Sequence, residues 1–204
     1  MTSVADFAHR FVPASAPGRA PLLLLHGTGG DENDLLPLGR ELAPGRALLS
    51  PRGQVLEGPH PRFFRRLAEG VFDVEDVRRR TADLAAWVTE AGRHYGLEKP
   101  VALGFSNGAN IAAAMLLLHP DVLGGAVLLR ALAPVEPGSL SGLDGKPVLV
   151  ATGSSDPINP IANGERLSQL LQAAGADVTH EVVPGSHGLT PRDVEIARNF
   201  LNRH

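Results

Sequence analysis

The feature that most constrains the fold is the alternation of short apolar runs with longer segments of helical periodicity. Strands are expected at residues 7–12, 21–25, 47–50, 101–105, 126–129, 148–151 and 178–183. Helices are expected at residues 34–42, 77–95, 107–119, 160–174 and 191–201. Several strands are apolar without alternation, which is typical of parallel strands covered on both faces. The pattern therefore predicts an α/β fold, with a mostly parallel sheet of about seven strands and helices on both faces.

Residues 52–76 interrupt this alternation. They show no clear periodicity and contain many turn residues, together with the aromatic residues Phe63, Phe64 and Phe72. A loop this long inside a compact domain is usually functional or disordered, and the aromatic residues argue against disorder. We therefore expect one domain over residues 1–204, with a folded excursion at residues 52–76 that shapes a pocket over one end of the sheet.

Local signals refine some element ends. Residues 7–12 and the proline-containing connection after them favour a hairpin at the sheet edge. Thr190-Pro191 and Asn159-Pro160 each combine a residue typical of an N-cap with proline at the first helical position.

Composition excludes several classes of protein. The length of 204 residues suits one domain, and a net charge of −3 without a basic stripe argues against nucleic acid as a partner. The arginine run at residues 78–80 is interpreted as a solvated helix face. The absence of cysteine excludes disulfides, thiolate metal sites and a cysteine nucleophile. The N-terminus lacks the pattern of a secretory signal and no apolar run is long enough to span a bilayer, so a cytoplasmic protein is expected.

The segment Gly104-Phe105-Ser106-Asn107-Gly108 matches the pattern G-x-S-x-G. A predicted strand precedes it and a predicted helix follows it, which is the context of a nucleophile elbow. The turn in such an elbow is so tight that the neighbouring residues must be small, and the two glycines satisfy that need. An ordinary turn that holds a serine by chance is the alternative.

An acid and a base follow the serine in the order expected for a Ser-Asp-His triad. Asp156 lies just after the strand at residues 148–151, and His187 lies on the loop after the last strand. Because the carboxyl ends of parallel strands meet at one sheet edge, these side chains are expected near Ser106. Ser106 would attack a carbonyl, His187 would take its proton, and Asp156 would orient the imidazole. The alternatives are an Asx-turn at Asp156 and a local hydrogen bond at His187.

The strand at residues 21–25 ends in His26-Gly27-Thr28-Gly29-Gly30. This loop predicts backbone donors for an oxyanion, and the N–H groups of Thr28 and Asn107 form the expected pair. A phosphate-cradling loop is a competing interpretation, but the endings typical of P-loops and dinucleotide folds are missing. Acidic residues at 31, 32 and 34 could suggest a metal, yet negative charge in the first turn of a helix explains them. No metal and no cofactor are predicted.

Together these segments resemble the carboxylesterase/phospholipase family of α/β-hydrolases, which includes the acyl-protein thioesterases. The matching segments are Leu25-His26-Gly27-Thr28-Gly29-Gly30-Asp31, Gly104-Phe105-Ser106-Asn107-Gly108, Gly153-Ser154-Ser155-Asp156-Pro157-Ile158-Asn159-Pro160 and Gly185-Ser186-His187-Gly188. Two further segments resemble a bacterial subgroup linked to quinone and hydroquinone stress. They are Ser50-Pro51-Arg52-Gly53 with Pro61-Arg62-Phe63-Phe64-Arg65-Arg66, and Leu128-Leu129-Arg130-Ala131.

The resemblance implies an α/β-hydrolase fold without a large cap domain, a small-molecule ester substrate and a homodimer. It implies the same roles for Ser106, Asp156, His187, Thr28 and Asn107. Asn107 replaces the glutamine common in the family, but the oxyanion hole uses a backbone N–H, so activity is expected to survive. The side chains expected to line the substrate pocket are Phe63, Phe64, Phe72 and Arg130. For the aromatic residues the alternative is core packing, and for Arg130 it is surface solvation.

The sequence thus favours a serine carboxylesterase that hydrolyses small carboxylic esters, with thioesters as a further substrate class, through an acyl-enzyme. The alternative is a non-catalytic protein that binds small molecules on a hydrolase scaffold. A His187 remote from Ser106 and Asp156 would favour that alternative.

Overall fold

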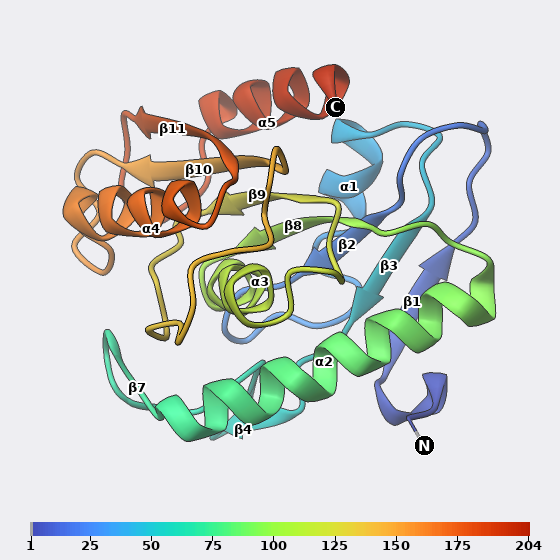
Figure 1. Ribbon diagram of the computed structural model, residues 1–204, viewed down its shortest axis with the longest axis horizontal. Coiled ribbons are helices and arrows are strands. Elements are labelled where there is room, and N and C mark those ends of the chain that lie inside the picture. Colours follow the sequence, from blue (N-terminus) through green and yellow to red (C-terminus); the bar gives the residue numbers. More distant parts are fainter. Residues whose placement is uncertain (1) are drawn as a thin grey trace.

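Within residues 2–204, which a computed structural model describes, seven strands form one sheet in the order β1-β3-β2-β8-β9-β10-β11 (Figure 1). Their bounds are β1 His9–Val12, β2 Leu22–Leu25, β3 Leu48–Pro51, β8 Val101–Phe105, β9 Gly125–Leu129, β10 Pro147–Gly153 and β11 Asp177–Val183. Strand β1 pairs antiparallel with β3, and the other neighbours in this sheet pair in parallel. The predicted mostly parallel sheet is confirmed.

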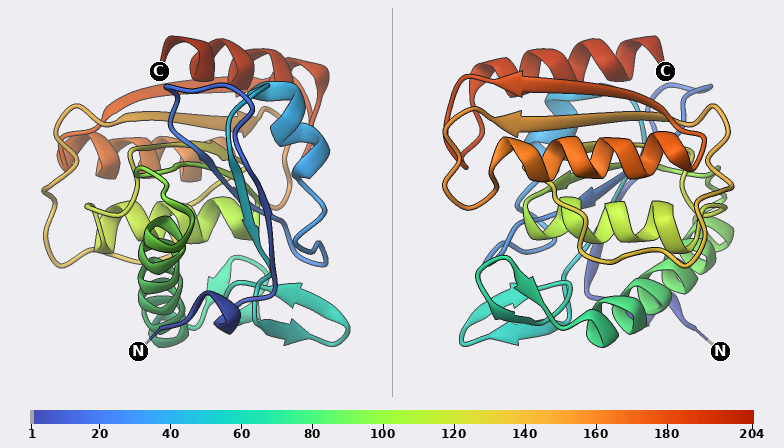
Figure 2. Two further views of the ribbon diagram at one scale, coloured as in Figure 1. Left: turned by 90° about the vertical axis from the view of Figure 1, so that its right-hand side faces the viewer. Right: turned by 60° about the vertical axis from the view of Figure 1, so that its left-hand side comes forward.

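Five α-helices in this part of the chain cover the two faces of the sheet (Figures 1 and 2). Their bounds are α1 Leu36–Leu42, α2 Val74–Tyr95, α3 Asn107–Leu118, α4 Ile161–Ala173 and α5 Pro191–Arg203. Helices α2, α3 and α4 lie on one face, and α1 and α5 lie on the other. The four leucines of β2 are all buried and alternate between the two hydrophobic layers. A strand packed on both faces has no polar side, which explains its unbroken apolar run.

One of the two predicted N-caps is present in the structure and the other is not. The Thr190 side chain accepts a hydrogen bond from the backbone N–H of Asp193, which confirms the predicted N-cap, and the two residues form a capping box. The predicted cap at Asn159 is wrong, because α4 begins at Ile161 without a side-chain cap. The Asn159 side chain instead donates to the carbonyl of Ala131, 2.8 Å away.

Residues 52–76 fold as two short antiparallel hairpins that precede the main part of α2. Strand β4 (Val55–Glu57) pairs with β5 (His60–Arg62), and β6 (Arg66–Ala68) pairs with β7 (Val71–Phe72). Phe63 and Phe64 lie between the hairpins and are buried, with exposed fractions of 2% and 0%. Burial of two aromatic side chains supplies the apolar anchor that such short strands need.

The edge hairpin predicted for the N-terminal strand is wrong. Strand β1 lies at the sheet edge but pairs with β3, because parallel neighbours β3 and β8 occupy both edges of β2.

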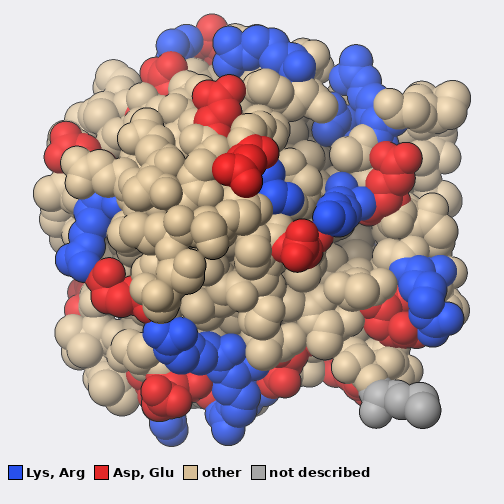
Figure 3. All heavy atoms as spheres, viewed as in Figure 1, with Lys and Arg blue, Asp and Glu red and all other residues tan. Residues whose placement is uncertain are grey.

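The surface carries mixed charge, and blue and red side chains are interspersed over the face shown in Figure 3. No helix among residues 2–204 is both long and apolar enough to cross a bilayer.

Candidate active site

The site lies where the strand order changes direction. From β2 the chain continues outward to β3 on one side, whereas β8 lies on the other side of β2 and leads on to β9. The loops that leave β2 and β8 therefore diverge, which opens the crevice in which open α/β sheets bind ligands. The loop after β2 carries Thr28, and the turn after β8 carries Ser106.

Ser106 occupies a strained turn between β8 and α3. Its backbone has φ of 51° and ψ of −114°, a conformation that few residues other than glycine adopt. A Cβ atom at Gly104 would lie 2.6 Å from the Cα of Ala109, and one at Gly108 would lie 2.0 Å from the carbonyl oxygen of Leu25. Only glycine fits at these two positions, as the tight elbow predicts.

A chain of hydrogen bonds joins Ser106, His187 and Asp156. His187 Nε2 lies 2.9 Å from Ser106 Oγ, and His187 Nδ1 lies 2.7 Å from Asp156 Oδ2. A carboxylate at Asp156 accepts a hydrogen bond from Nδ1–H, and the proton stays on the imidazole. Nε2 is then left with a lone pair directed at the serine hydroxyl. The Asp156 side chain is fully buried, whereas that of His187 is 22% exposed. Three segments that are distant in sequence thus meet in the geometry of a nucleophile, a base and an orienting acid.

The two interpretations of Asp156 are compatible, because its two carboxylate oxygens have different partners. Oδ1 accepts hydrogen bonds from the backbone N–H groups of Ile158 at 2.9 Å and Asn159 at 3.0 Å. The first of these is the bond of an Asx-turn. Oδ2 faces His187, so the turn fixes the carboxylate in the orientation that the imidazole requires.

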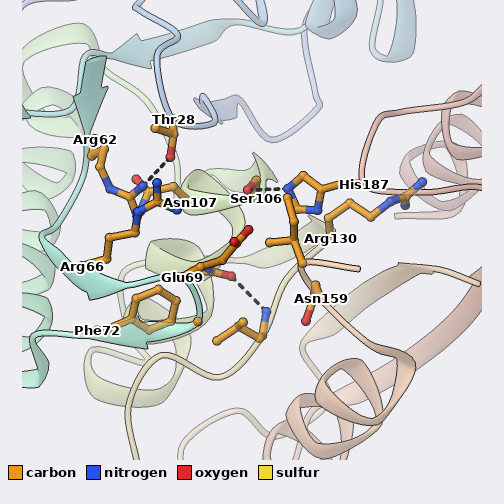
Figure 4. A pocket seen from close by; sticks show the side chains of 14 residues that line it. Thr28, Arg62, Arg66, Glu69, Phe72, Ser106, Asn107, Arg130, Asn159 and His187 are labelled. Carbon is orange, nitrogen blue, oxygen red and sulfur yellow. Dashed lines mark hydrogen bonds between the residues drawn. The ribbon is translucent and has the colours of Figure 1, made fainter. Parts of the chain in front are cut away.

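The backbone N–H groups of Thr28 and Asn107 are free to bind an acceptor. Within residues 2–204, neither group donates to a protein acceptor. Asn107 is the first residue of α3, so its N–H also carries the partial positive charge of a helix N-terminus. Both residues line the same pocket as Ser106 and His187 (Figure 4).

The pocket beside Ser106 is lined mainly by polar side chains (Figure 4). Its apolar side chains are Phe72, Leu132 and Ile158. The prediction that Phe63 and Phe64 line the pocket is wrong. Phe63 packs against the ring of His26 and Phe64 against Phe72, with ring centroids 4.7 and 5.1 Å apart. Of the three aromatic residues, Phe72 alone reaches the pocket.

Arg130 lines the pocket, but its guanidinium is fully buried and is occupied by protein groups. It forms a bidentate ion pair with Asp193, with N–O distances of 2.6 and 2.8 Å. It also donates to the carbonyls of Ser186 at 2.9 Å and Gly188 at 3.1 Å, which flank His187. Figure 4 shows the guanidinium extending away from Ser106. Arg130 therefore holds the His187 loop in place, and the alternative of surface solvation is wrong.

His26 is a structural residue of this site that the sequence did not single out. Its Nδ1–H donates to the carbonyl of Gly27 at 2.7 Å, and its Nε2 accepts from the N–H of Gly53 at 3.0 Å. Burial lowers the pKa of this imidazole, which keeps it in the neutral form that can accept a hydrogen bond. His26 thereby joins the Thr28 loop to the start of the excursion. The feature of the sequence that could have identified His26 is its position directly after a buried strand.

The helical explanation for the acidic residues at 31, 32 and 34 is wrong, because α1 begins at Leu36 and has no acidic residue in its first turn. Two of them have protein partners instead. Glu32 forms a bidentate ion pair with Arg52, at 2.5 and 2.8 Å. Asp31 accepts a hydrogen bond from the backbone N–H of Asn33 at 2.7 Å. No group of three or more His, Asp or Glu side chains in the described part of the chain is arranged to hold a metal ion.

The fold and the site define a hydrolase of the α/β class, and sequence comparison supports that conclusion. The family model described as phospholipase/carboxylesterase matches residues 85–204, and the model described as alpha/beta hydrolase fold matches residues 20–141. The chain belongs to the phospholipase/carboxylesterase family of α/β hydrolases, as the motifs indicated.

Individual relatives cover nearly the whole chain. The protein MhqD of Bacillus subtilis (strain 168) is 43% identical over 181 residues, which are 88% of this chain and 90% of MhqD. The Bacillus cereus carboxylesterase structure has a TM-score of 0.95 and 44% identity, and the match covers 98% of this chain and 95% of that one. A carboxylesterase from Mesorhizobium loti has a TM-score of 0.90 and 33% identity, with 96% and 94% covered.

Proposed function

We propose that this protein is a serine carboxylesterase that hydrolyses small carboxylic esters through a covalent acyl-enzyme. The observation that supports the proposal most strongly is the hydrogen-bonded chain from Ser106 through His187 to Asp156. The similarity to carboxylesterase structures points to the same reaction class. Thioesters share the acyl chemistry and form a second substrate class within the proposal.

The proposed mechanism follows from the donors and acceptors in the site. Ser106 Oγ attacks the ester carbonyl while His187 Nε2 takes its proton, and the buried Asp156 stabilises the resulting imidazolium. The N–H groups of Thr28 and Asn107 donate to the oxyanion of the tetrahedral intermediate. His187 then protonates the leaving oxygen of the ester as its bond to the carbonyl carbon breaks, and the alcohol departs. A water activated by His187 attacks the acyl-enzyme in the same way, which releases the acid and restores Ser106. Each step requires only groups of this chain, the ester and water.

The pocket lining favours a short acyl group. Each methylene of an acyl chain gains about 0.8 kcal/mol when it is buried against apolar atoms. Phe72, Leu132 and Ile158 are the apolar side chains of the lining, so a long alkyl chain would find few such partners. Hydrolysis of p-nitrophenyl esters should therefore decrease in kcat/KM from acetate to octanoate. An increase along that series would contradict the small-substrate part of the proposal.

The main test is hydrolysis of p-nitrophenyl acetate by wild type and Ser106→Ala. We expect the substitution to remove essentially all of the enzymatic rate, since activity above water then rests on the oxyanion donors and on binding alone. Ser139→Ala is the matched control, because Ser139 is exposed and does not line the pocket. Equal rates for wild type and Ser106→Ala would refute the proposal.

Asp156→Asn separates the two roles of Asp156. The amide oxygen of asparagine can still accept from the N–H groups of Ile158 and Asn159, so the turn and the melting temperature should persist. The amide NH2 would face His187 Nδ1 and favour the wrong tautomer, and kcat should decrease by about 10³–10⁴-fold. A folded variant with wild-type kcat would show that Asp156 serves the turn alone.

A further inference from the structure

The end of strand β5 contacts both residues that supply the proposed oxyanion donors. The carbonyl of Pro61 accepts from the N–H of Gly29 at 2.9 Å, and Arg62 Nη1 donates to Thr28 Oγ1 at 2.7 Å. One residue further, the N–H of Phe63 donates to the side-chain Oδ1 of Asn107 at 2.8 Å. We call residues 61–63 the brace. It ties the loop after β2 and the start of α3 to the excursion that borders the pocket.

Arg62 places a buried positive charge in this brace. Its side chain is 3% exposed, whereas that of its pocket neighbour Arg66 is 33% exposed. Its carboxylate partner Glu57 lies 3.3 Å from Nη1, but Glu57 also forms a bidentate pair with Arg66. Two guanidinium groups therefore share one carboxylate, and the buried charge of Arg62 is incompletely neutralised. Charge in a water-poor site acts more strongly on a nearby anion than charge in solvent does.

The hydrogen bonds of Arg62 argue against a substrate carboxylate as that anion. A carboxylate binds a guanidinium best through two parallel N–H donors. In Arg62, Nε donates to the carbonyl of Phe64 and Nη1 donates to Thr28. In Arg66, Nε and Nη2 both donate to Glu57. Each two-donor edge of the Arg62 guanidinium therefore contains an occupied nitrogen, whereas the Nη1–Nη2 edge of Arg66 can still bind another acceptor. The charge of Arg62 beside Thr28 is thus better matched to an anion that forms within the site.

We propose that Arg62 is a positioning residue of the oxyanion hole, which holds Thr28 in place and adds a buried positive charge beside its N–H. This inference rests on the proposed esterase function. Arg62 would then strengthen binding of the transition state more than binding of the ester. It also connects the excursion, which borders the substrate pocket, to the rate of the chemical step.

The test compares Arg62→Gln with wild type on two p-nitrophenyl esters, a neutral acetate and a succinate half-ester that carries a carboxylate. We expect kcat to decrease by about 10–30-fold for both esters, less than the 10²–10³-fold that loss of a direct donor costs. KM should stay within about threefold, as for an interaction made mainly in the transition state. The inhibition constant of phenylboronic acid, which forms a tetrahedral adduct with serine, should increase by a similar factor. The control is Arg65→Gln, because Arg65 is exposed and pairs with Asp73 outside the pocket.

A double-mutant cycle tests whether Arg62 acts on the rate through Thr28. Thr28→Val removes the hydroxyl that Arg62 holds but keeps the backbone N–H, and Thr28 is exposed, so this variant should fold. We expect Thr28→Val to lower kcat in the same direction, and the double variant to be little worse than Arg62→Gln alone. If Arg62→Gln does not fold, the inhibition constant of phenylboronic acid for Thr28→Val tests the inference alone. In that case an unchanged inhibition constant refutes the inference.

Three outcomes would overturn the inference. In the first, kcat of Arg62→Gln equals that of Arg65→Gln on both esters. In the second, Arg62→Gln changes only KM of the succinate ester. In the third, the effects of Arg62→Gln and Thr28→Val on kcat are additive. The second outcome would assign Arg62 to substrate carboxylate binding. These results are distinct from failure of the proposed function, which would appear as hydrolysis that does not depend on Ser106.

Discussion

Replacement of Arg130 by methionine should strongly destabilise the protein, because Arg130 joins three parts of the chain. Its guanidinium and the carboxylate of Asp193 are both fully buried. The substitution leaves Asp193 without its cation and leaves the carbonyls of Ser186 and Gly188 without donors. The loop that carries His187 loses its attachment to β9 at the same time.

The magnitude follows from these contacts. Removal of one partner of a buried ion pair costs about 3–5 kcal/mol. Asp193 keeps two hydrogen bonds from Thr190, one from its N–H and one from its hydroxyl, which moves the ion-pair cost toward the lower end of that range. Loss of the donors to two carbonyls adds about 1 kcal/mol each. A total of about 5–6 kcal/mol corresponds to a decrease in melting temperature of about 10–24 °C for a chain of this size.

Urea unfolding followed by fluorescence measures this cost, because Trp87 is the one tryptophan of the sequence and is fully buried. The paired variant Arg130→Met with Asp193→Leu should be more stable than Arg130→Met alone, because an apolar pair leaves no buried charge. The control is Arg166→Met, which breaks an ion pair with Glu136 that is mostly exposed and should shift the melting temperature by less than about 2 °C. If Arg130→Met lowers the melting temperature no more than Arg166→Met does, the buried contacts of Arg130 do not stabilise the protein.

Two further predictions concern the elbow and the Thr28 loop. Gly108→Ala should prevent folding or lower the free energy of unfolding by more than about 4 kcal/mol, since its Cβ would lie 2.0 Å from a backbone oxygen. The control is Gly138→Ala, because a Cβ at Gly138 meets nothing within 4 Å, and comparable melting temperatures for the two variants would contradict the prediction. Burial holds the pKa of His26 below its ordinary 6.5, so the unfolded chain takes up the proton first and the free energy of unfolding should decrease as pH falls below about 6.5. His26→Gln, which can still accept from Gly53, should flatten part of that decrease in urea titrations at pH 5.5 and 7.5, and an unchanged slope would show that His26 does not contribute.

The elements that the sequence predicted well are those whose signals are local. The strand, turn and helix around Ser106 are encoded in consecutive residues, and β8 has the predicted bounds. The positions of Asp156 and His187 follow from one rule, since residues after parallel strands meet at one sheet edge. These inferences needed no knowledge of side-chain packing.

The contacts that the sequence did not predict depend on distant partners. Arg130 and Asp193 are separated by 63 positions, and nothing in the chain between them indicates a buried pair. The strands of the excursion are three residues long or shorter, which is too short for alternation to show which face is buried. The same limit explains Phe63 and Phe64, whose inward direction is set by hairpins that the sequence pattern did not reveal.

The most direct test of Ser106 as the nucleophile is active-site labelling with a fluorophosphonate, which reacts with an activated serine. We expect one adduct per chain in the native protein, located by peptide mass spectrometry on Ser106. Labelling should be absent in Ser106→Ala and strongly slowed in His187→Ala, because the hydroxyl is activated through Nε2. An adduct on another residue, or an esterase-active chain that resists the reagent, would contradict the assignment of Ser106 as the nucleophile.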